Sequence, residues 1–478
     1  MKLNISLATL ALLFSLSASA QVKKWTLEEC VTYALEKNIS IQQSQLDVQT
    51  AEYNKKSAMG NFLPSVNASA THNWNNGLTQ DVTDGTLKVQ TTQNTSVGLN
   101  AGVNLFQGLT NLNTMHRANL QILANQYQID GMKDDIALMV ANSFLQILFN
   151  KETLKVRQSQ YDLTQQELER TQTLIANGQL PEGEIYELEA NSASQEQQIV
   201  VAENNVRLSL INLAQLLLIN DYENFDISTE DYDIPASVIL DTRPSDIYQK
   251  ALEIRNEVKV SETNVEIAEV NYDLAVGGIS PTLSAFYSYN TRASYQDRAG
   301  TPIVNPADPT SDPILGYVTS TQEPVRVPTI TSTTVSPDPI YDQFDRNGGH
   351  VFGLQLQIPI FNGFRNHVNM QTSRITLEKA RLQLENTKID LESTVYQSYN
   401  DALAASKAYV AAEKTLIARQ QAYDYAQERF DVGVINSFEF TQTQQQLEAA
   451  QSELVRTKFD YIFKIKVLEF FFGIPITE

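Results

Sequence analysis

The chain has one cysteine, Cys30, among 478 residues, so it cannot form an internal disulfide and must be held together by packing. It is also poor in basic residues: 35 Lys and Arg against 56 Asp and Glu give a formal net charge of −21. A nucleic acid is therefore an improbable partner, because phosphate binding needs basic patches. Beyond the N-terminus, no apolar run reaches the ~20 residues of a membrane-spanning helix.

Signals of catalysis are missing as well. The four histidines, His72, His116, His350 and His367, are scattered, and no His, Cys and Asp cluster has metal-ligand spacing. There is no Gly-x-Ser-x-Gly elbow and no phosphate-binding loop. We therefore expect no enzyme activity, no cofactor and no metal site.

The N-terminus reads as a secretory signal over residues 1–20. Lys2 gives the positive start, a mostly apolar stretch follows, and Ala18-Ser19-Ala20 fits a cleavage site. Gln21 follows that site where a lipid anchor would need cysteine. We expect an exported chain without a helical membrane anchor.

The sequence repeats itself. Leu105-Phe106-Gln107-Gly108 returns 255 residues later as Ile360-Phe361-Asn362-Gly363, and Gly178 returns as Gly433. Upstream, Ala34-Leu35-Glu36 returns as Ala251-Leu252-Glu253 at an offset of 217. The offsets differ by 38 residues (255 − 217), which places an insertion in the second copy. A duplication of this kind predicts two copies of one structural unit.

Each copy combines short strands that alternate apolar and polar residues with helices of unusual length. Apolar spacing of three and four residues predicts helices, and alternation predicts strands. A 65-residue helix would be roughly 100 Å long. We expect repeat 1 over 21–219, a linker over 220–243, repeat 2 over 244–473 and a tail over 474–478. The expected helices are 25–60, 111–176, 184–218, 245–276, 366–430 and 437–472, the strands 64–74, 95–106, 281–291 and 350–361, and the long loops 75–94 and 292–347, the second exposed and mobile.

Four strands of this length, apolar on one face, fit the ~9–11 residues that cross a membrane as a strand. Strands in lipid need every backbone group paired, so the sheet must close. Single-chain barrels start at about 8 strands, so closure requires other copies: two chains give 8 and three give 12. Residues at the membrane boundary would be aromatic, and the candidates are Trp74, Tyr287, Tyr289 and Phe352. A soluble sandwich is the alternative, but it leaves the long helices unexplained.

The order of these elements resembles the TolC-type outer membrane efflux protein family, also called outer membrane factors, over residues 25–473. The resemblance rests on matched features in both copies. They are Thr26-Leu27-Glu28-Glu29, Ala34-Leu35-Glu36-Lys37-Asn38, Leu63-Pro64, Ser280-Pro281, the two Phe-x-Gly exits at 105–108 and 360–363, and the turns at Gly178 and Gly433.

The resemblance implies a mixed α+β fold, mainly of long helices, with two internal repeats and four membrane strands per chain. Three copies would form a 12-stranded barrel in the outer membrane of a Gram-negative bacterium, continued by a 12-helix tunnel in the periplasm. It implies a passive exit duct for efflux or type I secretion. Its partners would be a periplasmic adaptor and an inner-membrane pump or exporter.

In that family the hairpin tips form the periplasmic mouth, where acidic residues narrow the entrance and the turns contact the adaptor. Carried over by spacing, the gate residues are Glu439, Glu184, Glu187 and Gln442, and the docking residues are Gly178, Gln179, Leu180, Gly433, Val434 and Ile435. The simpler interpretation is that these are helix-start carboxylates favoured by the helix dipole, and ordinary turn glycines. A structural or adhesive protein that spans the periplasm and displays surface loops is the alternative function. The sequence does not name a transported substrate.

Overall fold

The structure is a computed structural model that describes residues 23–81, 85–229, 238–304, 313–327, 330–331 and 333–476. The predicted signal peptide, 1–20, lies outside these residues. The chain divides into two compact units. The helical unit comprises Met1–Glu52, Asn119–Glu269 and Ile375–Glu478, and the sheet unit comprises Tyr53–Ala118 and Val270–Arg374.

Three pairs of helices have the same length in the two halves. α2 (Leu27–Lys37) and α6 (Pro244–Ile254) have 11 residues each, and α3 (Ile39–Gly60) and α7 (Asn256–Gly277) have 22 each, both pairs 217 residues apart (244 − 27; 256 − 39). The long helices α4 (Thr110–Ala176) and α9 (Arg365–Asp431) have 67 each, 255 apart (365 − 110). α5 (Glu184–Leu216) and α10 (Ser437–Phe472) follow them in the two halves.

Left-handed backbone conformations recur at the same offset of 255. Leu109 and Phe364 have φ of 62° and 65°, although a side chain rarely adopts such values. Each follows a glycine, Gly108 or Gly363, that is also left-handed, at the point where a strand gives way to a long helix. The ends of α5 and α10 match in the same way, with Leu218 at 59° and Gly473 at 98°.

The first helix of each half is broken, where one continuous helix was expected over 25–60 and 245–276. Asn38 and Arg255 have extended ψ values of 128° and 129°. The Asn38 side chain accepts a hydrogen bond from the Ser40 backbone N–H at 2.8 Å, which starts the following helix. Upstream, Thr26 and Glu29 form a capping box at the start of α2.

Apolar clusters fill the middle of the helical unit. One joins α2, α4 and α5 and includes Cys30, Phe144 and Leu213, each 0% exposed. The other joins α6, α9 and α10 around Ile247, Val395 and Ile465. Burial raises the pKa of the Cys30 thiol to about 12, so the single cysteine is an inert packing residue.

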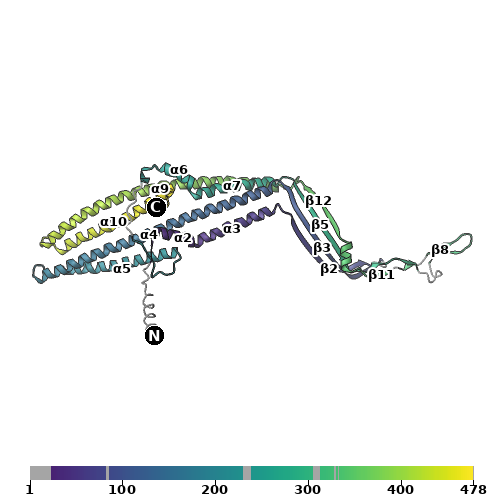
Figure 1. The fold of residues 1–478 in the computed structure, drawn as a ribbon, viewed down its shortest axis with the longest axis horizontal. Helices are drawn as coiled ribbons and strands as arrows, with labels where there is room; N and C mark the ends of the chain where they lie inside the picture. The colour runs from purple at the N-terminus through teal and green to yellow at the C-terminus, as the bar shows by residue number, and fades with distance from the viewer. Residues whose placement is uncertain are drawn as a thin grey trace, which may run out of the picture. The chain divides into compact units, whose positions relative to one another are not determined.

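One four-stranded antiparallel sheet dominates the other unit, in the order β12-β5-β3-β2 (Figure 1). Its strands are β2 (Ser65–Gln80), β3 (Leu87–Gln107), β5 (Thr282–Ser294) and β12 (Gly349–Gln357). The register sets the apolar residues of all four strands on one face; one row reads Val66, Ala101, Tyr287 and Phe352. The opposite face is mostly polar, as in the row Asn67, Asn100, Ser288 and Val351.

Several expected boundaries differ from the structure. The expected loop 75–94 is mostly strand, since β2 runs to Gln80 and β3 starts at Leu87, while β12 ends at Gln357 and not near 361. The linker contributes Asp226–Ile227 (β4), paired with Lys24–Trp25 (β1), and the 3-10 turn Ile239–Asp241. The expected loop 292–347 contains β6 (Arg298–Ala299), β7 (Ile303–Val304), β8 (Ile314–Tyr317), β9 (Pro324–Arg326), β10 (Ile330–Thr331), β11 (Thr334–Val335) and α8 (Ile340–Arg346).

Backbone pairing explains why the long loop is not featureless. Its strands join in two-stranded ladders, β6 with β11, β7 with β10 and β8 with β9. Gln343 fixes α8 to the end of β5, because its side chain accepts a hydrogen bond from the Ser294 N–H and donates to the Ser294 carbonyl. In the part of the chain that the structure describes, no helix is apolar and long enough to span a membrane.

Candidate functional site at the hairpin tips and the seam between them

Both helical hairpins reverse direction through the same backbone motif. Gly178 and Gly433 have φ of 71° and 73°, and no atom lies within 4 Å of the position a Cβ would take. At the first turn the Gly178 N–H donates to the Ile175 carbonyl and the next N–H donates to the Leu174 carbonyl, both at 2.9 Å. The second turn repeats both bonds. This is the Schellman arrangement that ends helices at a left-handed residue.

The predicted docking residues next to these glycines differ in exposure. Gln179 is exposed and Leu180 half-buried, and Val434 is 62% exposed. Ile435 is only 8% exposed, because it packs in a cluster inside the second hairpin with Phe430 and Phe440. The two phenyl rings stack with centroids 4.8 Å apart. Of these four side chains, Gln179 and Val434 are therefore exposed at the turns, while Ile435 packs against its own helices.

The four predicted gate residues also differ in their surroundings. Glu187, Glu439 and Gln442 are exposed, and the Glu439 backbone N–H donates to the Asn436 side chain at 2.9 Å, which caps α10. Glu184 is half-buried and reaches across to the second hairpin. Its Oε2 accepts hydrogen bonds from both the backbone N–H and the hydroxyl of Ser437. The structure thus joins the two tips through Glu184.

Behind the tips, the hairpins meet along a seam of polar residues at heptad spacing, which we call the polar seam. On α4 it consists of Thr153, Arg157, Gln160, Thr164, Glu167 and Thr171, and on α10 of Ser437, Thr441, Gln444, Glu448 and Gln451. Steps of four and three residues are the spacing of buried positions in coiled coils, which are usually apolar. Gln160, Thr164 and Gln444 are each at most 1% exposed.

Hydrogen bonds cross the polar seam from both sides. The Gln444 side chain donates to the Thr164 hydroxyl at 2.9 Å, and Gln160 donates to Gln451 at 2.6 Å. Several buried polar atoms find no hydrogen-bond partner among the described residues: Gln160 Oε1, Glu167 Oε2, Thr171 Oγ1, Gln195 Nε2 and Oε1, and Thr441 Oγ1. A partly satisfied polar interface is weaker than an apolar one, because each unpaired buried group costs about 1–3 kcal/mol.

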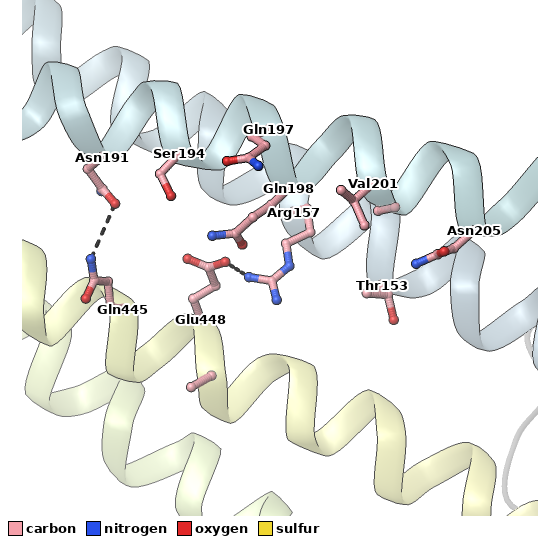
Figure 2. Close-up of a pocket in the computed structure, with 12 residues that line it drawn as sticks. Thr153, Arg157, Asn191, Ser194, Gln197, Gln198, Val201, Asn205, Gln445 and Glu448 are labelled. Atoms are coloured by element: carbon pink, nitrogen blue, oxygen red, sulfur yellow. Dashed lines mark hydrogen bonds and ion pairs between the residues drawn. The ribbon is translucent and has the colours of Figure 1, made fainter.

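A cavity of about 620 Å³ opens beside the polar seam, between α4, α5 and α10 (Figure 2). Inside it Arg157 forms an ion pair with Glu448, whose side chain is 7% exposed. Burial lowers the pKa of Arg157. The Asn191 side chain faces Gln445 and accepts its hydrogen bond at 3.5 Å. Most of the lining residues carry amide or hydroxyl side chains.

Glu167 is the most unusual carboxylate of the polar seam. It is 6% exposed and accepts one hydrogen bond, from Gln427 of α9 at 3.0 Å. Burial raises its pKa, and the charge of Arg170 opposes the shift. Arg170 itself pairs with Asp431 of α9 at 2.6 Å. Close to the turns, the two hairpins are therefore joined by charged side chains, and one of these, Glu167, is buried.

The predicted aromatic residues lie on the apolar face of the sheet. Phe352 is 80% exposed and Trp74 67%, while Tyr287 and Tyr289 flank His350. The Tyr287 hydroxyl lies 2.8 Å from His350 Nδ1. The sheet thus exposes aromatic side chains together with polar groups on its apolar face.

Sequence reasoning missed the polar seam. Its signal was present, since Gln, Thr and Glu occupy positions 160, 164, 167 and 171 at four- and three-residue steps on α4. A search for apolar residues at heptad spacing does not find a helix face whose buried positions are polar.

Comparison with known proteins shows which sequences and structures the chain resembles. The family model described as "Outer membrane efflux protein" matches residues 31–217 and 247–462. No curated protein sequence matches the chain. Solved structures share the fold at low identity. The outer membrane protein VceC from Vibrio cholerae is 13% identical, with a TM-score of 0.73 over 94% of this chain and 96% of that one.

Two further structures are similar. The CmeC outer membrane channel of Campylobacter jejuni is 16% identical, with a TM-score of 0.73 over 94% of this chain and 85% of that one. The MtrE outer membrane channel of Neisseria gonorrhoeae, solved in its open state, is 17% identical, with a TM-score of 0.63 over 94% of this chain and 89% of that one. At these identities the likeness shows the fold.

Proposed function

This chain belongs to the outer membrane efflux protein family, and from that premise we propose that it forms a passive, trimeric exit duct through the outer membrane of a Gram-negative bacterium. The duct serves a tripartite efflux or type I secretion system. Two duplicated halves per chain give four strands and four long helices. Three copies then supply a 12-stranded barrel and a 12-helix tunnel.

The observation that carries this proposal is the exposed apolar face of an open sheet. Leu354 and Val66, on its two edge strands, are 68% and 61% exposed, and β2 and β12 each pair on one side only within the described residues. Unpaired edges invite further strands. In lipid they must be paired, and closure with two further copies satisfies every edge.

The other face of the sheet suits the wall of a water-filled pore. Ser288 donates a hydrogen bond to the Asn100 side chain at 2.6 Å, and Asn290 donates to Ser288 at 2.7 Å. This polar face would line the duct, while Trp74, Tyr287, Tyr289 and Phe352 would contact lipid near the headgroups.

The hairpin tips form the periplasmic mouth in this proposal. Glu439, Glu187, Gln442 and Glu184 line the entrance, and three copies of each carboxylate would attract cations. The partly satisfied polar seam lets the two hairpins of a chain separate at low cost, which opens the mouth. Gln179 and Val434, with Gly178, Leu180, Gly433 and the packed Ile435 behind them, offer the surface for a periplasmic adaptor. An inner-membrane pump or exporter completes the system.

Conductance in planar bilayers tests the proposal. Purified, folded protein should give stable, long-lived channels, and a solution mass in detergent near three chains. Repeated absence of channels from a trimeric preparation would instead favour a structural or adhesive protein that spans the periplasm. For the adaptor surface, a photo-reactive amino acid at position 179 or 434 should capture a periplasmic protein, whereas the same group at the buried position 435 should not.

A further inference from the structure

No acidic residue occurs in the four strands of the main sheet. β2, β3, β5 and β12 contain none of the chain's 56 Asp and Glu, and their Lys and Arg residues are Lys88 and Arg292. With histidine neutral, the sheet therefore carries two positive charges in a chain whose formal net charge is −21. Because no carboxylate within the strands offsets them, these two side chains decide the charge of the surface on which they lie.

The two basic side chains of the sheet differ in whether an acidic group neutralises them. Lys88 forms an ion pair with Asp81 at 2.9 Å. Arg292 is exposed, and its backbone carbonyl accepts a hydrogen bond from the Asn347 side chain at 2.7 Å. Its guanidinium has no ion-pair or hydrogen-bond partner among the residues that the structure describes. Arg292 is therefore the basic side chain of the sheet that is left to bind something else.

The residues around Arg292 on the polar face are short and neutral. Ser96 of β3 lies directly opposite it in the ladder. Asn290, two residues earlier on β5, donates its side-chain hydrogen bond to Ser288 at 2.7 Å, on the side away from Arg292. Ser294, two residues later, accepts a backbone N–H with its hydroxyl. None of these side chains can neutralise a guanidinium, so its charge acts on the space in front of the sheet.

In the proposed duct, Arg292 lies in the wall of the lumen near its outer end. It shares the polar face with Ser288 and Asn290, because alternate residues of a strand point to the same side. β5 begins after α7 and ends at Ser294, two residues beyond Arg292, where the long loop starts. Three copies of the chain would set three guanidinium groups at one level around the lumen. Rings of Arg or Lys side chains favour anions in pores.

We propose that Arg292 of three copies forms an anion-binding ring at the outer end of the barrel, and that the duct passes small solutes that carry a carboxylate, phosphate or sulfate group. This inference rests on the proposed trimeric duct and names a substrate class for it. The planar guanidinium fork matches such oxyanions with two parallel hydrogen bonds. The ring is opposite in sign to the carboxylates proposed for the mouth, so an anionic probe distinguishes the two.

Ion selectivity of the full-length protein in planar bilayers tests the ring. Under a gradient of KCl near 0.1 M, Arg292→Gln should lower the chloride-to-potassium permeability ratio several-fold. The difference should shrink near 1 M, because the Debye length falls from about 10 Å to about 3 Å. The control Arg298→Gln removes the same charge from β6, outside the main sheet, where Arg298 pairs with Asp338 at 2.5 Å. Asp338 keeps a second partner, Arg346, so this control should leave the ratio unchanged.

Inorganic triphosphate tests binding directly. Added to each side of the bilayer in turn, it should reduce the current from one side, and Arg292→Gln should weaken this block several-fold. Arg292→Lys should keep most of the permeability ratio but lose part of the block, because an ammonium lacks the bidentate fork. Ser96→Asp places a carboxylate directly opposite the guanidinium, so it should act like Arg292→Gln while the arginine is still present.

The same recordings separate this inference from the proposed function. Stable channels with the same permeability ratio and the same triphosphate block in the wild type and Arg292→Gln would overturn the ring and leave the duct standing. An equally large effect of Arg298→Gln would also overturn it, because the charge of the outer end as a whole would then set the selectivity. Wild-type protein that neither assembles nor conducts would refute the duct itself and the ring with it.

Discussion

The carboxylate of Glu184, at the start of α5, caps the start of α10 by accepting the backbone N–H of Ser437 at 2.8 Å and the hydroxyl of the same residue. Ser437 is 4% exposed, so this contact is shielded from water. A carboxylate at a helix N-terminus also gains from the helix dipole. The residue that spacing assigned to the gate is therefore a link between the two hairpins of one chain.

Glu184→Ala should loosen the mouth. Each of the two hydrogen bonds to this half-buried carboxylate is worth about 1.5 kcal/mol, the low end for charged groups. Single channels in planar bilayers should show larger conductance or more frequent open states than the wild type. Glu189→Ala removes an exposed carboxylate of α5 that is not among the proposed entrance residues, and it serves as the control. Equal conductance of all three proteins would leave Glu184 without a role in closure.

Acidification should strengthen the contact between the hairpins at Glu167. Burial raises the pKa of Glu167 above its unfolded value near 4.5. The native state therefore binds the proton more tightly, and its stability falls as pH rises through 4.5 and the raised native value. The contribution of Glu167 to tip stability should be largest below pH 4.5, and hydrogen exchange near the turns can measure it by comparison with a variant that lacks this carboxylate.

Glu167→Gln isolates this effect. The amide keeps the side-chain oxygen that accepts from Gln427 and removes the buried charge. The variant should be more protected than the wild type at neutral pH, and the difference should vanish at acidic pH. Glu169→Gln, at an exposed position of α4, should leave the pH profile unchanged. A wild-type profile flat between pH 4 and 8 would contradict the prediction.

Local sequence rules predicted the long elements well. α4 and α9 begin and end within one residue of the expected 111–176 and 366–430, because an uninterrupted apolar period and a terminal glycine define a helix. The breaks at Asn38 and Arg255 escaped prediction. Arg255 carries no helix-stop chemistry. It is 8% exposed, lies over the Phe470 ring at 4.5 Å and bonds Glu257, all tertiary contacts.

The sequence predicted the turns of the candidate site but not the contacts that join its two hairpins. Gly178 and Gly433 follow from the need for positive φ at a helix end. Glu184 and Ser437 are 253 residues apart in the sequence, and their pairing depends on how the two hairpins meet. The strand ends near Gln80 and Leu87 were missed because Asn, Gln and Thr read as loop residues, while cross-strand pairing holds them in the ladder.

Removing one partner of the ion pair between Arg157 and Glu448 should lower the stability of the protein. Glu448→Leu leaves the guanidinium beside the cavity without its counter-charge. The cost should stay below the roughly 3–5 kcal/mol of a fully buried pair, because the Arg157 side chain is 27% exposed. Thermal unfolding should show a lowered Tm for this variant.

The double change Arg157→Met with Glu448→Leu gives the matched control. Replacing both partners by apolar side chains removes the desolvation cost along with the attraction, so the Tm should recover to the wild-type value or above. If the double variant is as unstable as the single one, packing of these side chains outweighs their charge. The same double variant should open less readily in bilayers, since an apolar seam holds the hairpins together more firmly.

The turn glycines should respond to substitution as a matched pair, and Gly183 provides their control. Gly178→Ala and Gly433→Ala each place a Cβ on a left-handed residue, at a cost of about 1–2 kcal/mol. Neither side chain would meet a neighbour, so the cost is purely conformational. Gly183 has φ of −65° and equally open surroundings, so Gly183→Ala should be neutral or slightly stabilising. Hydrogen exchange at the tips measures all three, and a Gly183→Ala effect as large as the others would show that contacts outside the chain fix these turns.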